Sequence, residues 1–186
     1  FLKQSQTTAH TIPCRVVVTL AERKQPMAET PATRFLQAHG IPFSEHAYDY
    51  AAEQGRKGLI AAEELGIAQN LVFKTLMVVV DSKRVVGVAL PVARRVGLAR
   101  VAARCGGRNA KMRGPGKAQA LTGYKVGGRS PFGARTIVPV VFDATLDALE
   151  TFYINGGAQG FILGLSPADA IRCTQARTAD ICQPHA

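Results

Sequence analysis

Two β-branched runs separated by a short polar turn constrain the fold more than any other feature of the sequence. Residues 71–80 and 85–90 are rich in valine and other apolar residues, and Asp81, Ser82 and Lys83 lie between them. Such runs favour extended strands, because branched side chains pack well on a pleated surface. The spacing therefore predicts an antiparallel hairpin that ends at Pro91.

Helix and strand signals alternate along the rest of the chain. Thr30 and Pro31 form a typical helix start, and Ser166 and Pro167 repeat it. The expected helices span residues 31–39, 57–65, 98–105, 117–121 and 146–150, with a last one from Pro167. Further strands are expected at residues 41–50, 136–142, 151–155 and 161–165. Several connections are short, which favours an α+β fold with a mixed, largely antiparallel sheet closing into a partial barrel.

The length and composition suit one domain. The chain has 186 residues, of which 47% are hydrophobic, enough for one buried core. We expect this domain to span residues 27–186. Residues 1–26 differ in composition, and three interpretations stay open: an extension, an artefact of gene-start assignment, or an added strand. No apolar run approaches the roughly 20 residues that span a bilayer, and no signal peptide is recognisable, so no membrane contact and a cytoplasmic location are expected.

Basic side chains dominate the middle of the chain. Residues 82–142 contain no Asp or Glu, and the formal net charge of the whole chain is +10. The basic residues of this segment are Lys83, Arg84, Arg94, Arg95, Arg100, Arg104, Arg108, Lys111, Arg113, Lys117, Lys125, Arg129 and Arg135. A long segment of one sign creates a field that attracts polyanions. Nucleic acid is the leading candidate partner, although an anionic lipid surface would select the same charge.

The cysteines and histidines form no recognisable motif. Cys14, Cys105, Cys173 and Cys182 show no C-x-x-C pairing, and the four histidines are scattered. We therefore expect neither a metal site nor a cofactor, and no Ser-His-Asp or Cys-His arrangement is visible in the sequence.

A glycine-rich segment is the clearest candidate for ligand binding. Residues 122–133, TGYKVGGRSPFG, combine four glycines with basic and hydroxyl residues and no acid. Gly127 and Gly128 can adopt positive φ and expose bare N–H groups to an anion, and Lys125 and Arg129 add positive charge. The alternative is an ordinary hairpin turn after a strand-like run at residues 124–126.

Lys74 is the unusual residue of the first strand run, because it stands among apolar residues. Alternation along a strand places Val72 and Leu76 on its face, and Phe73 and Thr75 on the other. Two interpretations stay open: an edge-strand lysine that reaches solvent, or a partly buried ammonium in a pocket.

Several motifs in order and spacing resemble the YbaK/EbsC family. They are Phe73-Lys74-Thr75-Leu76 before the hydrophobic strand, Pro91 at the end of the hairpin, the glycine-rich segment, and Tyr153-x-x-Gly156-Gly157. The resemblance runs from about residue 30 to residue 181. The family comprises free-standing aminoacyl-tRNA editing proteins, related to the insertion domain of bacterial prolyl-tRNA synthetases.

The resemblance implies an aminoacyl-tRNA deacylase that removes a mischarged amino acid, typically Cys from the tRNA for proline. The implied partners are tRNA and prolyl-tRNA synthetase. In the cysteine-specific members the substrate's own thiol attacks the ester and gives a thiolactone. Such an enzyme needs no nucleophile of its own, which agrees with the missing triad.

The resemblance also implies roles for individual residues. Lys74, Gly127 and Gly128 would be catalytic, with Lys74 holding an oxygen of the aminoacyl-adenosine and the loop N–H groups stabilising an oxyanion. Substrate binding would involve Tyr48, Thr75, Thr122, Tyr124, Ser130, Gly156 and Gly157. Contacts with tRNA would come from Arg94, Arg95, Lys125 and Arg129. Three of these have structural alternatives: Tyr48 as a half-buried strand aromatic, Thr75 as a strand filler, and Ser130 as the cap of the Pro131 turn.

Two positions depart from the cysteine-specific pattern. Lys57 and Ile162 stand where those members carry a phenylalanine and an aspartate. The amino acid removed therefore stays open, and an alanine- or serine-directed editor that uses water is the first alternative. A non-catalytic RNA-binding module is the second, and a Schiff-base lysine enzyme a more distant third.

Overall fold

The structure, a computed structural model, describes residues 28–50 and 57–184. These residues form five α-helices, one 3-10 helix and eight strands. The helices are α1 (Pro31–Ala38), α2 (Lys57–Glu64), α3 (Leu98–Arg104), α4 (Pro115–Thr122) and α5 (Pro167–Thr174), with η1 at Ala144–Ala148. The strands are β1 (Ser44–Ala47), β2 (Val72–Val80), β3 (Arg84–Pro91), β4 (Ala110–Met112), β5 (Val140–Asp143), β6 (Phe152–Ala158), β7 (Phe161–Leu165) and β8 (Arg177–Ala179).

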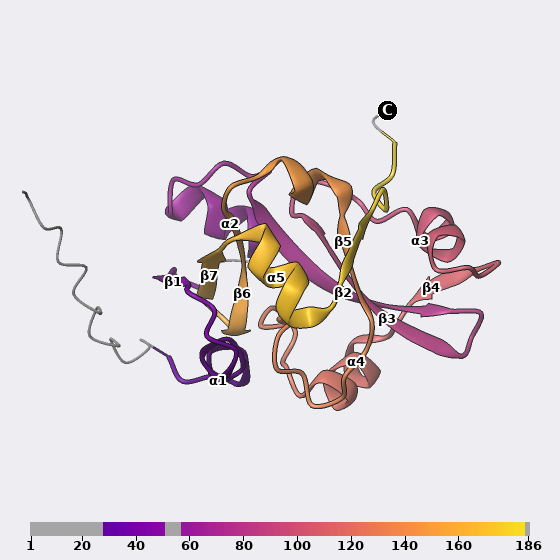
Figure 1. The fold of residues 1–186 in the computed structure, drawn as a ribbon, viewed down its shortest axis with the longest axis horizontal. Helices are drawn as coiled ribbons and strands as arrows, with labels where there is room; N and C mark the ends of the chain where they lie inside the picture. The colour runs from indigo at the N-terminus through magenta and orange to yellow at the C-terminus, as the bar shows by residue number, and fades with distance from the viewer. Residues whose placement is uncertain (1–27, 51–56, 185–186) are drawn as a thin grey trace, which may run out of the picture.

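All eight strands belong to one mixed sheet with the order β1-β7-β6-β2-β3-β5-β8, and β4 adds to β2 outside this path (Figure 1). The pairs β1–β7, β6–β7, β2–β3 and β2–β4 are antiparallel, whereas β2–β6, β3–β5 and β5–β8 are parallel. The predicted α+β class and mixed sheet are confirmed. The sheet stays open, because β1 and β8 form its two ends and do not pair with each other.

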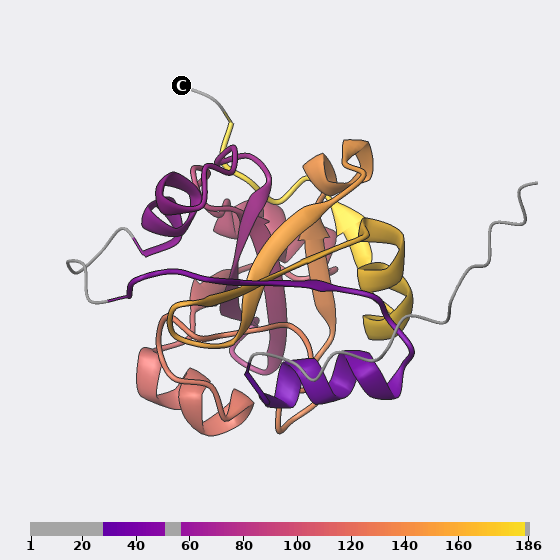
Figure 2. The same ribbon diagram turned by 90° about the vertical axis from the view of Figure 1, so that its left-hand side faces the viewer.

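Helices cover both faces of this sheet. In Figures 1 and 2, α2 lies above the sheet, and α1 and α4 lie below it. The largest core cluster joins α1 through Leu36 to Phe73, Phe152 and Phe132. A second cluster joins α3 through Val101 to the distal half of the hairpin on the other face, and a third joins α2 to Val72 and Val92. The alternation of β2 thus directs its side chains into different cores.

The predicted hairpin is confirmed, with β2 and β3 antiparallel from Phe73 opposite Pro91 to Val80 opposite Arg84. Asp81 and Ser82 both have positive φ, which lets the chain reverse between the strands. The predicted helix start at Thr30 is also confirmed. The Thr30 side chain accepts a hydrogen bond from the Thr33 N–H, and Pro31 occupies the first turn.

Three local predictions were wrong. The strand expected at residues 136–142 is confined to β5, because Pro139 has no N–H to donate to a ladder. The helix expected at residues 146–150 is instead the 3-10 helix η1, capped by Asp143. No strand forms at residues 124–126, so the glycine-rich segment is a loop that follows α4 and no hairpin turn.

The strands β4 and β8 were not predicted, because each has only three residues and no recognisable alternation of apolar and polar residues. Residues 1–27 lie outside the described part of the chain, so their separation from a domain at residues 27–186 stays a prediction. Within the described residues, no helix is long and apolar enough to cross a membrane.

Candidate active site

Lys74 is a half-buried ammonium held by backbone carbonyl groups. Its Nζ donates to the Val92 oxygen at 3.0 Å and to the Arg94 oxygen at 2.7 Å. Burial lowers its pKa, the neighbouring Cys182 acts in the opposite direction, and Arg95 lowers the pKa further. The pocket interpretation of Lys74 therefore fits this geometry. An ammonium has three N–H donors, and these two bonds leave one for a ligand.

The carbonyl groups that hold Lys74 belong to the segment after β3, and residues 181–183 form hydrogen bonds with this segment. The Gly97 N–H donates to the Ile181 oxygen at 2.7 Å, and the Gln183 N–H donates to the Arg95 oxygen at 2.8 Å. Between them, Val96 and Cys182 form an antiparallel bridge. Residues 181–183 thereby limit how far the segment that follows β3 can move away from Lys74.

The buried carboxylate of Asp143 binds the backbone of residues 181 and 182. Its Oδ2 accepts from the N–H groups of Ile181 and Cys182, both at 3.2 Å, and its Oδ1 accepts from the Thr145 hydroxyl at 2.8 Å. Burial acts to raise the pKa of Asp143, but hydrogen bonds from Cys182, Thr145 and Ile181 outweigh it, so the pKa lies below its ordinary value.

Asn155 connects the face of Lys74 to the glycine loop. In the parallel pair β2–β6, Val72 is opposite Tyr153 and Phe73 is opposite Ile154, so Asn155 lies on the same face as Lys74. The Asn155 Nδ2 donates to the Gly127 oxygen at 2.9 Å and to the Ala158 oxygen at 3.0 Å. Its Oδ1 accepts from the Gly157 N–H at 2.8 Å. The sequence prediction missed Asn155, although an amide before Gly156-Gly157 in an apolar strand was a usable signal.

The glycine loop packs closely against the chain, which explains its glycines. Gly127 has φ of 85°, and a Cβ at this position would overlap the Tyr50 hydroxyl. A Cβ at Gly128 would lie 3.1 Å from the Ala158 carbonyl carbon. The Gly128 N–H donates to the Lys125 oxygen at 3.0 Å, so it is not a ready oxyanion donor. The Gly127 N–H, by contrast, donates to no atom of the described residues.

Tyr48 and Tyr50 lie beside the loop. The Tyr48 N–H donates to the Gly160 oxygen at 2.9 Å, and the two tyrosine rings are 6.5 Å apart. The Tyr50 hydroxyl donates to the Val126 oxygen at 3.3 Å, and Gln159 donates to the same oxygen at 2.7 Å. Burial, and then Tyr50, raise the pKa of Tyr48. Tyr48 contacts Tyr50, which the prediction did not include and which in turn contacts the loop, so the substrate-binding role of Tyr48 stays a prediction.

Four predicted substrate-binding residues point into the protein. The Tyr124 hydroxyl donates to the Phe132 oxygen at 2.6 Å, and burial raises its pKa. The Thr122 hydroxyl donates to the Ala118 oxygen at 2.9 Å, and the Ser130 hydroxyl accepts from the Phe132 N–H at 3.3 Å. Thr75 is buried on the face opposite Lys74, and its hydroxyl has no partner among the described residues. This geometry gives them a packing role in the loop and the core, and their part in substrate binding stays a prediction.

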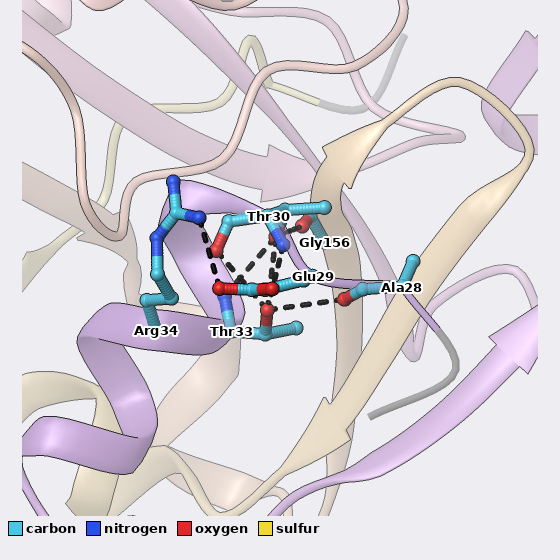
Figure 3. A network of polar contacts seen from close by, with 6 residues as sticks. All are labelled: Ala28, Glu29, Thr30, Thr33, Arg34 and Gly156. Atoms are coloured by element: carbon cyan, nitrogen blue, oxygen red, sulfur yellow. Dashed lines mark hydrogen bonds and ion pairs between the residues drawn. The ribbon is translucent and has the colours of Figure 1, made fainter. Parts of the chain in front are cut away.

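Gly156 lies against the start of α1, in the network of Figure 3, and a Cβ at Gly157 would lie 3.1 Å from the Thr30 hydroxyl oxygen. The Thr30 hydroxyl donates to the Gly156 oxygen at 2.5 Å, while the Thr30 N–H donates to the Thr33 hydroxyl at 2.9 Å. A Cβ at Gly157 would lie 2.9 Å from the Tyr124 ring. These glycines let the β6–β7 bulge pack against α1, and the Gly157 N–H holds Asn155, while their predicted contact with substrate stays a prediction.

The four predicted tRNA-binding residues fall into two groups. Arg94 supplies one of the carbonyl groups that hold Lys74, Arg95 follows it, and the Arg94 guanidinium donates to the Gln183 oxygen at 3.0 Å. Lys125 is exposed on the glycine loop, and Arg129 follows Gly128. The Arg129 Nη2 donates to the Pro115 oxygen at 3.4 Å, whereas its buried Nε has no partner among the described residues. Burial lowers the pKa of Arg129.

Ile162, which departs from the cysteine-specific pattern, lies on the same face of the sheet as Lys74. Ile162 is buried and lies directly between His46 of β1 and Asn155 of β6. The His46 ring stacks edge-on against Tyr153 at 5.3 Å, and its Nε2 is 2.9 Å from the Ser44 hydroxyl. The apolar side chain of Ile162 therefore lies between His46 and Asn155 on the face of the sheet that carries Lys74. The side chain of Lys57, the other departure, lies outside the described part of the structure.

Comparison with known proteins points to one chemistry. The family described as "Aminoacyl-tRNA editing domain" matches residues 56–173. A protein of Enterococcus faecalis named "Putative Cys-tRNA(Pro)/Cys-tRNA(Cys) deacylase EbsC" is 26% identical over 159 residues, which cover 86% of this chain and 96% of that protein.

Two solved structures share the fold. The hypothetical protein APE2540 has a TM-score of 0.73 at 24% identity, covering 82% of this chain and 99% of its own. A structure described as a "putative trans-editing enzyme for prolyl tRNA synthetase" has a TM-score of 0.70 at 21% identity, covering 84% of this chain and 100% of its own.

Proposed function

The chain belongs to the aminoacyl-tRNA editing domain family, and we propose that within it the protein is a trans-acting deacylase that clears mischarged tRNA, above all Cys-tRNA(Pro). The observation that carries the proposal is the Lys74 ammonium, held by the Val92 and Arg94 carbonyl groups on the face where Asn155 fixes the glycine loop. The E. faecalis relative supports the choice of substrate by its name.

The proposed reaction uses the thiol of the substrate cysteine. Its sulfur attacks the ester carbonyl carbon, the C–S bond forms, and the C–O bond to the terminal ribose breaks. The thiol proton passes to the departing ribose oxygen, so the products are a thiolactone and tRNA with a free hydroxyl. No water is consumed, which makes the step a lyase-type reaction.

The protein's part in this reaction is to position groups and to stabilise charge. The remaining N–H of Lys74 donates to the carbonyl oxygen as negative charge develops on it. The Gly127 N–H is the candidate second donor. Holding the thiol near the carbonyl supplies the rest, because an oriented intramolecular attack avoids much of the entropic cost.

A water-dependent editor of Ala- or Ser-tRNA is the second candidate, and Ile162 favours it. A pocket carboxylate would bind the α-ammonium of the substrate, and Ile162 offers only apolar surface in its place. When two substrate side chains differ by one small group, an apolar pocket discriminates between them by only about 1–3 kcal/mol of binding free energy. A binding module without chemistry explains Lys74 less well, since binding alone does not require a desolvated ammonium.

A panel of mischarged tRNAs tests the proposal. Cys-, Ala- and Ser-charged tRNA(Pro), together with correctly charged Pro-tRNA(Pro), are incubated with the protein and the released products are identified by mass spectrometry. We expect the fastest release from Cys-tRNA(Pro), with thiolactone as the product. Free cysteine without thiolactone would replace the thiol mechanism with hydrolysis, and no release from any mischarged tRNA would refute the deacylase proposal. Addition of prolyl-tRNA synthetase to the same reactions tests it as a partner through the rate.

A further inference from the structure

A basic groove lies at the start of α4, and Lys74 is not among the residues that line it. Its walls are β4 with the following Arg113, the first turn of α4 at residues 114–117, and Val79 and Ser82 of the hairpin. The groove encloses about 560 Å³. In Figure 1, β4 lies beside the end of the hairpin at the right, and α4 lies lower in the view.

The cations of this groove are not neutralised by acidic side chains. Lys111, Arg113 and Lys117 line it, and none of them forms an ion pair within the described residues. The Arg113 Nε donates to the Lys117 oxygen at 3.2 Å, which holds two of the cationic residues together. Asp81, which precedes Ser82, already accepts from the Arg108 and Asn109 N–H groups. The groove therefore keeps its positive field.

The glycines of the groove are not required by the fold. A Cβ at Gly114 or at Gly116 would meet no atom within 4 Å, and neither residue has positive φ. Their small size instead leaves the backbone open to a ligand. The first turn of α4 also lacks an acidic residue and a side-chain cap, so the positive end of the helix dipole faces the same opening.

The groove is connected to the candidate active site by contacts and by a shared strand. Arg129, next to Gly128, donates to the oxygen of Pro115 in the groove wall. Val79 of the groove lies on β2, five residues after Lys74, which corresponds to about 16 Å along the strand, and its side chain points to the opposite face of the sheet. A nucleic acid whose end lies at Lys74 is large enough to reach the groove past the glycine loop, where Arg129 contacts Pro115.

We propose that this groove binds the sugar-phosphate backbone of the acceptor stem of the tRNA whose aminoacylated end lies at Lys74. The inference rests on the proposed function. Lysine and arginine side chains and helix N-terminal N–H groups are the usual partners of phosphate oxygens. The half-exposed Met112 adds an apolar surface for a ribose. Contacts of this kind read the shape of an RNA helix and not its sequence, so the groove adds affinity without selecting the tRNA identity.

The test compares two charge-reversal pairs in the full chain. Lys111→Glu/Lys117→Glu changes the groove. Arg104→Glu/Arg177→Glu is the matched control, because these arginines line a second hollow of about 540 Å³ that also contains Asp180. Uncharged tRNA(Pro) is titrated at several salt concentrations, and deacylation is measured with Cys-tRNA(Pro) and with the small ester cysteinyl-adenosine.

The groove variant is expected to bind tRNA at least tenfold more weakly, and the slope of log K against log salt is expected to fall by about two, one for each lost phosphate contact. Its turnover of cysteinyl-adenosine should equal that of the unchanged protein, and the control pair should change tRNA affinity less than threefold. Unchanged tRNA affinity in the groove variant, or an equal loss in both pairs, overturns the inference. If the unchanged protein deacylates nothing, the proposed function fails, while the titration with uncharged tRNA still decides the role of the groove.

Discussion

At the scale of single residues, Lys74 is the clearest case of a side chain whose environment changes its chemistry. Its ammonium is partly removed from water and is bound by two carbonyl groups instead of a carboxylate. Without a bound counter-charge, its field is not neutralised at the point where an oxyanion would form. These contacts suit the proposed role, in which Lys74 stabilises charge without acting as a nucleophile.

Replacement of Lys74 should abolish most deacylation while the fold persists, because Val72 and Leu76 provide the packing of this face. We expect Lys74→Ala to lower kcat on Cys-tRNA(Pro) by on the order of 10²–10³. Lys83→Ala, at an exposed lysine of the same hairpin, is the control and should keep normal activity. Circular dichroism establishes that both variants fold. Near-normal turnover by a folded Lys74→Ala protein would remove Lys74 from the site.

Gly127 combines a positive φ with close packing, so a larger residue should fail for two reasons. In Gly127→Val, the new side chain overlaps the Tyr50 hydroxyl and the backbone is strained, and the expected loss of activity is as large as for Lys74→Ala. Gly106→Val separates the two causes, because Gly106 also has positive φ but has open space around it. Measured deacylation should be lost in Gly127→Val only. Equal activity of the two variants would mean that the glycine loop is a turn without a role in the reaction.

At the scale of elements, the site depends on segments that meet only in the folded chain. The hairpin and α1 could be predicted, since a run of valines and a Thr-Pro helix start act locally. The strands β4 and β8 could not be predicted, because three-residue strands carry no periodicity and form by pairing with β2 and β5. The same holds for Asn155 and Tyr50, whose importance follows from contacts with a loop about 30 and about 80 residues away in the chain.

Asp143 supplies an element-scale prediction, because it ties the C-terminal segment to η1. Asp143→Asn removes the charge that accepts from the Ile181 and Cys182 N–H groups, which should cost about 1–3 kcal/mol at pH 7. The pKa of Asp143 is lowered in the folded state, so its stabilisation is present above the unfolded pKa of about 3.9 and is lost as the pH falls through the folded pKa.

Urea denaturation at pH 7 and below pH 3 measures this difference. The gap in unfolding free energy between the unchanged protein and Asp143→Asn should be largest at pH 7 and should narrow on acidification. Asp147→Asn, in the 3-10 helix that Asp143 caps, is the control, because within the described residues the Asp147 side chain accepts a hydrogen bond from Thr178 and none from residues 181–183. A gap that stays constant with pH would show that the Asp143 charge is not the cause.

At the scale of the whole molecule, the acid-free segment between Asp81 and Asp143 includes the helices α3 and α4, and few of its cations are paired. Among the described residues, the ion pairs within it are those of Arg84 and Arg100, with Asp81 and Asp180. The positive field could be predicted from the sequence, because the net charge of a segment is the sum of its charged residues and does not depend on the fold. It did not predict that Arg94 and Arg95 would stand beside Lys74, since that depends on the turn after β3.

Binding of tRNA should therefore be weak and strongly dependent on salt, since each phosphate contact releases counterions. Charge reversal at Arg94 and Arg95 should lower both the affinity and its salt dependence. Arg172→Glu, at an arginine already paired with Asp169, is the control and should have little effect. Fluorescence anisotropy with labelled tRNA at two or more salt concentrations measures both quantities. An affinity that does not change with salt would contradict the electrostatic account.

In the proposed reaction, the protein positions a mischarged cysteine so that the cysteine's own thiol removes it from tRNA. The most direct measurement compares the deacylation of Cys-tRNA and Ser-tRNA on the same tRNA(Pro) body, since the two amino acids differ only in sulfur and oxygen. We predict that Cys-tRNA(Pro) is cleared faster, with thiolactone among the products, and that Ser-tRNA(Pro) is released more slowly. Equal or faster release of serine would contradict the thiol-assisted mechanism and would favour attack by water.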